Sequence, residues 1–153
     1  VVHMTSYAPL LAKEKHTQWS PDLIYFNNRE VKPTTGYCVQ KLYGQNAGSH
    51  YIPSQIILDN QDNRVKLRIG SSIVRDSKTG DVIVKLVNLL PVSVETEIQL
   101  PGIGSVQPSA VRTVLAGAPE STPLPVTDTI EVGVNFKQQL PAYSFTVIRL
   151  KTK

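Results

Sequence analysis

The hydrophobic period of the sequence changes near Gly48, and this change limits the possible folds more than any other feature. From residue 51 onward, apolar residues tend to recur at every second position. The clearest example is Val92–Leu100, in which Glu95, Glu97 and Gln99 alternate with apolar residues or threonine. A period of two is typical of a strand that buries one face. We therefore predict a mainly β fold.

Further short strands are predicted across the same part of the chain. They lie at residues 56–58, 65–69, 72–75, 82–87, 111–115, 129–136 and 145–150. Lys78–Asp81 has the composition of a hairpin turn, and Arg64, Lys66 and Arg68 are expected on the wet face of a strand. Many short strands with no helical pattern between them indicate an antiparallel β-sandwich of jelly-roll type. We assign this sandwich to residues 48–153.

The first 47 residues have a different pattern, which predicts a helix, a strand and a second helix. Apolar residues in 1–12 have helical spacing, although Pro9 must kink that helix. Residues 23–26 are continuously apolar, as in a parallel strand covered on both faces, and we expect no partner strand for them in this segment. Thr34 or Thr35 can cap a helix that Gly44 terminates. This order is typical of an α/β barrel or a doubly wound sheet, so we expect 1–47 to be a remnant of a larger domain.

Composition narrows the possible functions. A chain of 153 residues with 41% hydrophobic residues can bury one ordinary core. Its net charge of +4 is dispersed, so nucleic acid is not a predicted partner. No apolar stretch approaches the roughly 20 residues that span a bilayer, so no membrane partner is predicted either. With Cys38 as the single cysteine and three scattered histidines, we predict no metal site and no cofactor. A secreted or periplasmic location is favoured, with a cytoplasmic one left open.

Three stretches of the first part and one at the end resemble a known family. They are MTSYAPLLA at 4–12, WSPDLIYFNN at 19–28, YCVQKLY at 37–43 and LPAYSFTVIRL at 140–150. Together they resemble the C-terminal part of the family 51 α-L-arabinofuranosidases, over essentially the whole chain. The resemblance implies that residues 1–47 are the final helix, eighth strand and eighth helix of a catalytic (β/α)8 barrel, and that the sandwich follows it.

The resemblance also implies where the chemistry lies. Retaining glycosidases use two carboxyl groups roughly 5–5.5 Å apart. In the family, the acid/base stands in an Asn-Glu dipeptide at the end of an earlier barrel strand, and none of the seven asparagines here is followed by glutamate. We expect both catalytic carboxylates upstream, and this chain alone to be inactive. Its implied partners are an N-terminal barrel of the same polypeptide, an arabinose-containing polysaccharide and further copies of the enzyme.

Some residues of the first part are candidates for the edge of a sugar pocket. Barrel active sites lie at the carboxyl ends of the strands, which is where Tyr25 and Asn27 would lie, while Trp19 and Asp22 come just before or open the strand. An aromatic wall and hydroxyl-binding groups suit a furanose. Alternatively, Trp19 packs between helix and strand, and the asparagines only form a turn.

Two other functions stay open at this point. A carbohydrate-binding module needs a planar array of exposed aromatic residues. The sandwich offers Tyr51, Phe136, Tyr143 and Phe145, and alternation turns Phe136 inward. A structural or protein-interaction sandwich without sugar chemistry is the other alternative, although it does not account for residues 1–47.

Overall fold

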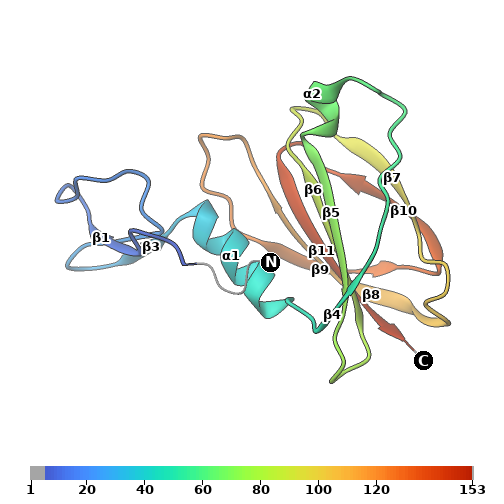
Figure 1. Cartoon of the computed structure of the whole chain (residues 1–153). Helices are drawn as coiled ribbons and strands as arrows, with labels where there is room; N and C mark the ends of the chain where they lie inside the picture. Colours follow the sequence, from blue (N-terminus) through green and yellow to red (C-terminus); the bar gives the residue numbers. More distant parts are fainter. Residues whose placement is uncertain (1–5, 153) are drawn as a thin grey trace.

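The computed structural model describes residues 6–152, and a six-stranded antiparallel sheet lies at its centre (Figure 1). In spatial order the strands are β4 (His50–Ile52), β5 (Ile69–Arg75), β6 (Val82–Asn88), β11 (Ser144–Thr152), β8 (Val106–Ala116) and β9 (Val126–Glu131). The predicted turn at Lys78–Asp81 joins β5 to β6, and Gly80 there has φ = 78°. The predicted strands at 72–75, 82–87, 111–115 and 145–150 are therefore confirmed.

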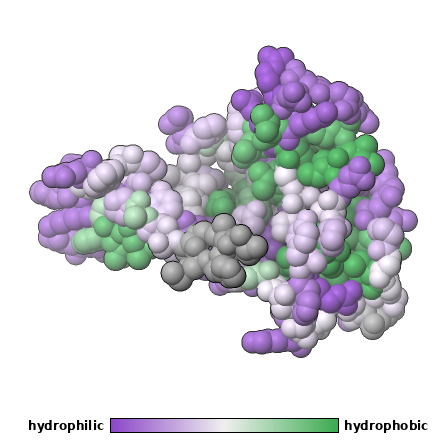
Figure 2. All heavy atoms as spheres, in the orientation of Figure 1, coloured by the Kyte–Doolittle hydropathy of each residue, from purple (hydrophilic) through white to green (hydrophobic). Residues whose placement is uncertain are grey.

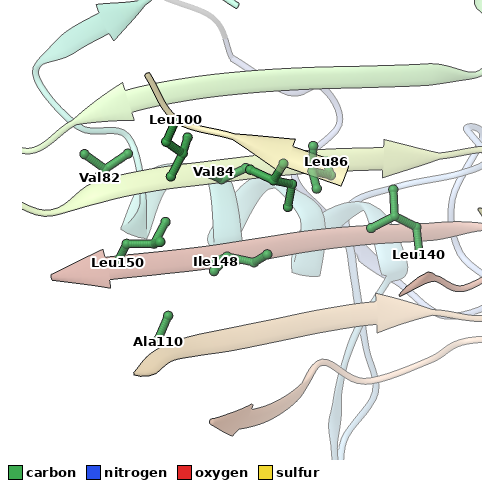
Figure 3. Close-up of a cluster of buried hydrophobic side chains, with 9 residues drawn as sticks. Val82, Val84, Leu86, Leu100, Ala110, Leu140, Ile148 and Leu150 are labelled. Atoms are coloured by element: carbon green, nitrogen blue, oxygen red, sulfur yellow. The ribbon is translucent and has the colours of Figure 1, made fainter. Parts of the chain in front are cut away.

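A two-stranded antiparallel sheet, β7 (Val94–Gln99) with β10 (Asn135–Leu140), packs against one face of the large sheet. Its alternation is as predicted, because Ile98 is buried while Glu95, Glu97 and Gln99 are exposed. The core between the two sheets contains Val82, Val84, Leu86, Ile98, Leu100, Ala110, Leu140, Ile148 and Leu150 (Figure 3). Each fully buried Val, Leu or Ile side chain contributes about 1.5–3 kcal/mol, so this core contributes strongly to the stability of the fold. The fold is thus mainly β, with antiparallel sheets packed as a sandwich.

Helix α1 (Thr35–Gln45) covers the opposite face of the large sheet. The Thr34 hydroxyl accepts a hydrogen bond from the Tyr37 backbone N–H at 3.3 Å, which confirms the predicted cap. Gly44 does not end the helix, which continues to Gln45 and is capped by Asn46. The second core on this face contains Cys38, Leu42, Val74, Ile83, Leu115, Phe145 and Val147.

The first part of the chain forms a small separate sheet (Figure 1, blue) of β1 (Leu11–Lys13), β2 (Ile24–Phe26) and β3 (Val31–Pro33). Strand β1 pairs in parallel with β2, which pairs antiparallel with β3. The predicted helix over 1–12 is wrong for its described residues, 6–12, and residues 1–5 lie outside the described part. Pro9 cannot donate a helical hydrogen bond, and Leu11 instead begins a strand.

The strand predicted at 23–26 forms, but it was wrongly expected to lack partners and to be covered on both faces. Two strands of this same segment flank it, and Phe26 at its end is exposed. Asn27 and Asn28 make the tight turn that returns the chain as β3.

Three further strand predictions are wrong. Residues 56–58 form no strand, and the predicted strand at 65–69 is largely replaced by the short helix α2 (Asn63–Lys66). Asp62 caps α2, since its Oδ1 accepts from the Arg64 backbone N–H at 2.8 Å, so Arg64 and Lys66 lie on a helix instead of a strand face. The strand predicted at 129–136 is divided between β9 and β10. Within residues 6–152, no helix is long and apolar enough to cross a membrane.

Candidate functional site

Trp19 lies in the connection between β1 and β2 and is 68% exposed, so it does not pack between a helix and a strand. The Thr17 hydroxyl fixes this connection. It accepts a hydrogen bond from the Trp19 backbone N–H at 3.1 Å and donates one to Asp22 Oδ2, also at 3.1 Å. The indole is therefore presented to solvent on a loop whose backbone is held in place.

Asp22 and Tyr25 also form hydrogen bonds that hold this loop. Asp22 is only 1% exposed, and its backbone N–H donates to the Tyr25 hydroxyl at 2.9 Å. Asp22 Oδ1 is enclosed and has no hydrogen-bond partner among residues 6–152. Thr17 thus links Trp19 to Asp22, and the backbone N–H of Asp22 links them to Tyr25.

Asn27 belongs to a second group at the carboxyl ends of β1 and β2. Its Nδ2 donates to Glu14 Oε2 at 2.7 Å and to Glu30 Oε1 at 3.3 Å. Its Oδ1 accepts from the backbone N–H groups of Arg29 and Glu30 at 2.9 and 3.1 Å. Both the nitrogen and the oxygen of the Asn27 side-chain amide are therefore already hydrogen-bonded within this group.

Lys32 completes this second group. Its Nζ lies 2.8 Å from Glu14 Oε1 and 3.0 Å from Glu30 Oε1. The hydrogen bonds from Lys32 and then Asn27 lower the pKa of both carboxyl groups, and the bond to Glu14 raises the pKa of Lys32. Both carboxylates are held in their charged form.

A shallow hollow of about 540 Å³ lies beside the second group. Leu11, Phe26 and Val31 give it an apolar wall, and the Asn27–Glu30 turn forms its rim. The structure therefore brings Asn27 to this hollow, while Trp19, Asp22 and Tyr25 do not line it.

A family model described as the α-L-arabinofuranosidase C-terminal domain matches residues 1–144. The chain belongs to this family. It corresponds to the C-terminal part of family 51 α-L-arabinofuranosidases, in agreement with the resemblance read from the sequence.

Individual relatives of this C-terminal domain agree with the family match. The chain is 51% identical over 55 residues, 36% of its length, to the extracellular exo-α-L-arabinofuranosidase of Streptomyces chartreusis. It is 34% identical over 107 residues, 69% of its length, to a probable α-L-arabinofuranosidase A of Aspergillus terreus. The chain spans only 7% and 16% of the lengths of these two relatives.

Solved structures give the same result for the fold. An arabinose-bound family 51 α-L-arabinofuranosidase superposes with a TM-score of 0.83 and 32% identity, over 97% of this chain and 24% of that one. A Thermotoga maritima α-L-arabinofuranosidase in an arabinose complex has a TM-score of 0.70 over 86% of this chain and 32% of that one. At 14% identity, it supports the fold alone.

The second group of this C-terminal domain is unsuited to acid catalysis. A glycosidase acid needs a raised pKa so that it holds a proton near neutral pH, whereas Glu14 and Glu30 have lowered pKa values. The group can accept hydrogen bonds from hydroxyl groups, and it can hold the turn rigid.

Sequence reasoning did not find Glu14, Glu30 and Lys32. A signal for two of them was present, because the dipeptide Asn27-Asn28 followed by residues of period two is typical of a turn between two strands. Glu14 could not be placed, because it reaches the group through the parallel pairing of β1 with β2.

Proposed function

We propose that this chain is the non-catalytic C-terminal part of an enzyme that removes terminal non-reducing α-L-arabinofuranosyl residues from arabinan or arabinoxylan with retention of configuration. Both catalytic carboxylates lie upstream in the same polypeptide, which we refer to as the longer protein. Residues 1–47 complete its catalytic (β/α)8 barrel, and residues 48–153 are a jelly-roll-type sandwich that braces the barrel.

The observation that carries this proposal is the small sheet. Sheets made only of parallel strands nearly always have both faces covered, and the small sheet contains one such parallel pair, β1 with β2, beside the antiparallel β3. Leu10, Leu11, Phe26 and Val31 on and beside this sheet are nevertheless exposed, and Figure 2 shows apolar side chains gathered on this end of the molecule. A barrel would cover this apolar surface and continue the parallel pairing.

The site proposal follows from the two groups described above. Trp19 offers an exposed aromatic face against which a sugar ring can stack, while Asp22 and Tyr25 hold its loop. Asn27 fixes the turn at the rim of the hollow, so its contribution to the pocket edge is chiefly the shape of that turn.

Two protein lengths test the activity. We expect the longer protein, obtained by extending the reading frame upstream, to release nitrophenol from 4-nitrophenyl α-L-arabinofuranoside, and the 153-residue chain to release none. NMR of the first-formed sugar should show the α anomer. Activity in the 153 residues alone would show that the catalytic carboxylates do not lie upstream. Inactivity of both proteins would contradict the proposed arabinofuranosidase activity.

Substitution of Trp19 tests the pocket edge. In the longer protein, Trp19→Ala should raise KM for arabinoxylan oligosaccharides about 5-fold or more, because a lost stacking contact is worth about 1 kcal/mol or more. The thermal midpoint should stay unchanged, since the side chain is exposed. An unchanged KM would show that Trp19 does not contact the substrate.

The matched control is Tyr51→Ala, which removes an aromatic side chain from the sandwich. Tyr51 is 66% exposed, whereas Phe136 and Tyr143 are only partly exposed and Phe145 is buried. One exposed aromatic residue makes no planar array, so we expect Tyr51→Ala to leave binding to insoluble arabinoxylan unchanged. A clear loss of binding would favour the carbohydrate-binding function instead.

A further inference from the structure

Lys85 is a charged residue in the middle of strand β6, and it is only 3% exposed. In the sheet it lies opposite Ser72 of β5 and Val147 of β11. Its side chain points to the face covered by α1, where its Nζ lies 5.8 Å from the centre of the Tyr43 ring. That ring in turn stacks on Phe145, with the ring centres 4.6 Å apart.

The Lys85 ammonium has no counter-charge among residues 6–152. It takes part in no hydrogen bond or salt bridge there, and its Nζ makes a cation–π contact with the Tyr43 ring. Asp76 and Asp81, the carboxylates at the nearby hairpin, are both bound by Arg149. Burial lowers the pKa of Lys85, and a buried cation without a partner is strongly unfavourable.

The described residues do not enclose the Lys85 ammonium completely. The enclosed side-chain atoms that lack a hydrogen bond in this part of the chain are Asp22 Oδ1 and Thr146 Oγ1, so the equally unbonded Lys85 Nζ keeps some contact with solvent. A hollow of about 570 Å³ lies close by, lined by Ser6, Tyr7, Gln40, Tyr43 and Gly44; Lys85 does not line it, and Tyr43 is the residue that it shares with the Lys85 contact. The space next to Tyr43 can therefore admit another side chain.

We propose that Lys85 forms an ion pair with a carboxylate of the catalytic domain and so ties that domain to the sandwich. This inference rests on the proposed function, because it takes the occupant from the longer protein. Charge complementarity selects a carboxylate, since an ammonium held against apolar and aromatic side chains needs one negative charge close by. The position agrees with this occupant, because α1 supplies Tyr43 and belongs to the segment that we assign to the barrel.

The first test measures the thermal midpoint of the longer protein with Lys85→Met and Lys85→Arg. Removing one partner of a buried ion pair strands the other charge, so Lys85→Met should lower the midpoint by about 3 °C or more. Lys85→Arg keeps the charge and should lower it less. Lys78→Met, at an exposed turn position, is the matched control and should have no effect.

The direction in which Lys85→Met changes the thermal midpoint shows whether Lys85 has a partner in the longer protein. If Lys85 has no partner in the longer protein, replacing it with methionine relieves a buried charge, and the midpoint stays equal or rises. That result would overturn the proposal.

A second test identifies the partner. A water-soluble carbodiimide should join the Lys85 amine to its carboxylate in the longer protein as an amide, with the carbodiimide converted to its urea. Peptide mass analysis should then find Lys85 linked to an Asp or Glu outside these 153 residues, and the link should be absent in Lys85→Arg. A link only to a carboxylate within these residues would overturn the proposal.

Hydrolysis of 4-nitrophenyl α-L-arabinofuranoside is measured in parallel. A longer protein that lacks this activity but shows the shift and the link would reject the proposed function and leave the ion pair standing.

Discussion

At the scale of single residues, the structure contains polar atoms whose burial is not compensated. Thr146 is fully buried in β11 between β6 and β8, and its hydroxyl has no hydrogen-bond partner among residues 6–152. A buried hydroxyl without a partner costs about 1–3 kcal/mol, whereas a methyl group of the same shape has no such cost. Thr146 is therefore a position at which an apolar residue would suit the fold better.

We predict that Thr146→Val raises the free energy of unfolding by about 1 kcal/mol, as measured by urea denaturation. The control is Thr113→Val. The Thr113 hydroxyl lies 3.0 Å from that of Thr127, so its removal should be neutral or destabilising. Destabilisation by Thr146→Val would show that its hydroxyl does have a partner.

The hydrogen bonds of Asp76 lead to a prediction of how the stability of the fold depends on pH. The backbone N–H of Lys78 donates to its carboxylate at 3.0 Å and Arg149 donates at 2.8 Å, and these bonds hold its pKa below the ordinary value of 3.8. A pKa that is lower in the folded state gives stability that is present above the unfolded value and lost as the pH falls below it.

We therefore expect the urea concentration at the midpoint of unfolding to decrease as the pH is lowered below about 4. The decrease should be less steep in Asp76→Asn. The variant should also be less stable at neutral pH, because the charge opposite Arg149 is gone. Parallel pH curves for the two proteins would contradict this role of Asp76.

At the scale of elements, two glycines near α1 have opposite requirements. Gly48 joins α1 to β4 with φ = 68°, and a Cβ placed there would lie 2.6 Å from Val74 Cγ2. Gly44 lies inside α1, and a Cβ there would meet nothing within 4 Å. Only the first position needs glycine.

Gly48→Ala should lower the free energy of unfolding by about 2 kcal/mol or more, because of both the backbone strain and the clash with Val74. Gly44→Ala should raise it by about 0.5–1 kcal/mol, as expected for alanine in a helix interior. Denaturation curves of the two variants provide the comparison. Equal effects would mean that the connection to β4 can shift.

Elements with strong local signals could be predicted from the sequence. Val92–Leu100 alternates cleanly and contains β7, and Thr34 marks the start of α1. The segments that failed had competing signals. Apolar residues at 65–69 suggested a strand, but Asp62 at the cap position gave the local chain a helical turn. Residues 1–12 suggested a helix, but Pro9 and pairing with a strand more than ten residues away favoured β1.

At the scale of the whole molecule, the candidate site was only partly predictable. Trp19, Asp22 and Tyr25 could be named as candidates because they lie in or just before a recognisable strand, and hydrogen bonds between residues close in sequence join them. The Glu14, Asn27 and Lys32 contacts depend on the order of three short strands, which local patterns do not encode.

The exposed apolar end of the molecule leads to a whole-molecule prediction. The 153-residue chain should bind more of an environment-sensitive hydrophobic dye per mole than the longer protein, because the barrel would cover Leu11 and Val31. Leu11→Ser together with Val31→Ser should remove most of the excess fluorescence. Leu124→Ser, on the exposed loop before β9, should not. Equal dye binding by both proteins would mean that nothing covers this surface.

The position of Cys38 and Leu42 has a consequence for protein engineering. Both side chains come from α1, yet they fill the core on one face of the central sheet. A chimaera that joins a foreign enzyme to this sandwich at residue 48 would leave behind the layer that shields Ile83, Phe145 and Val147. A transplantable module should therefore begin at Thr34, so that the helix and its cap travel with the sheet.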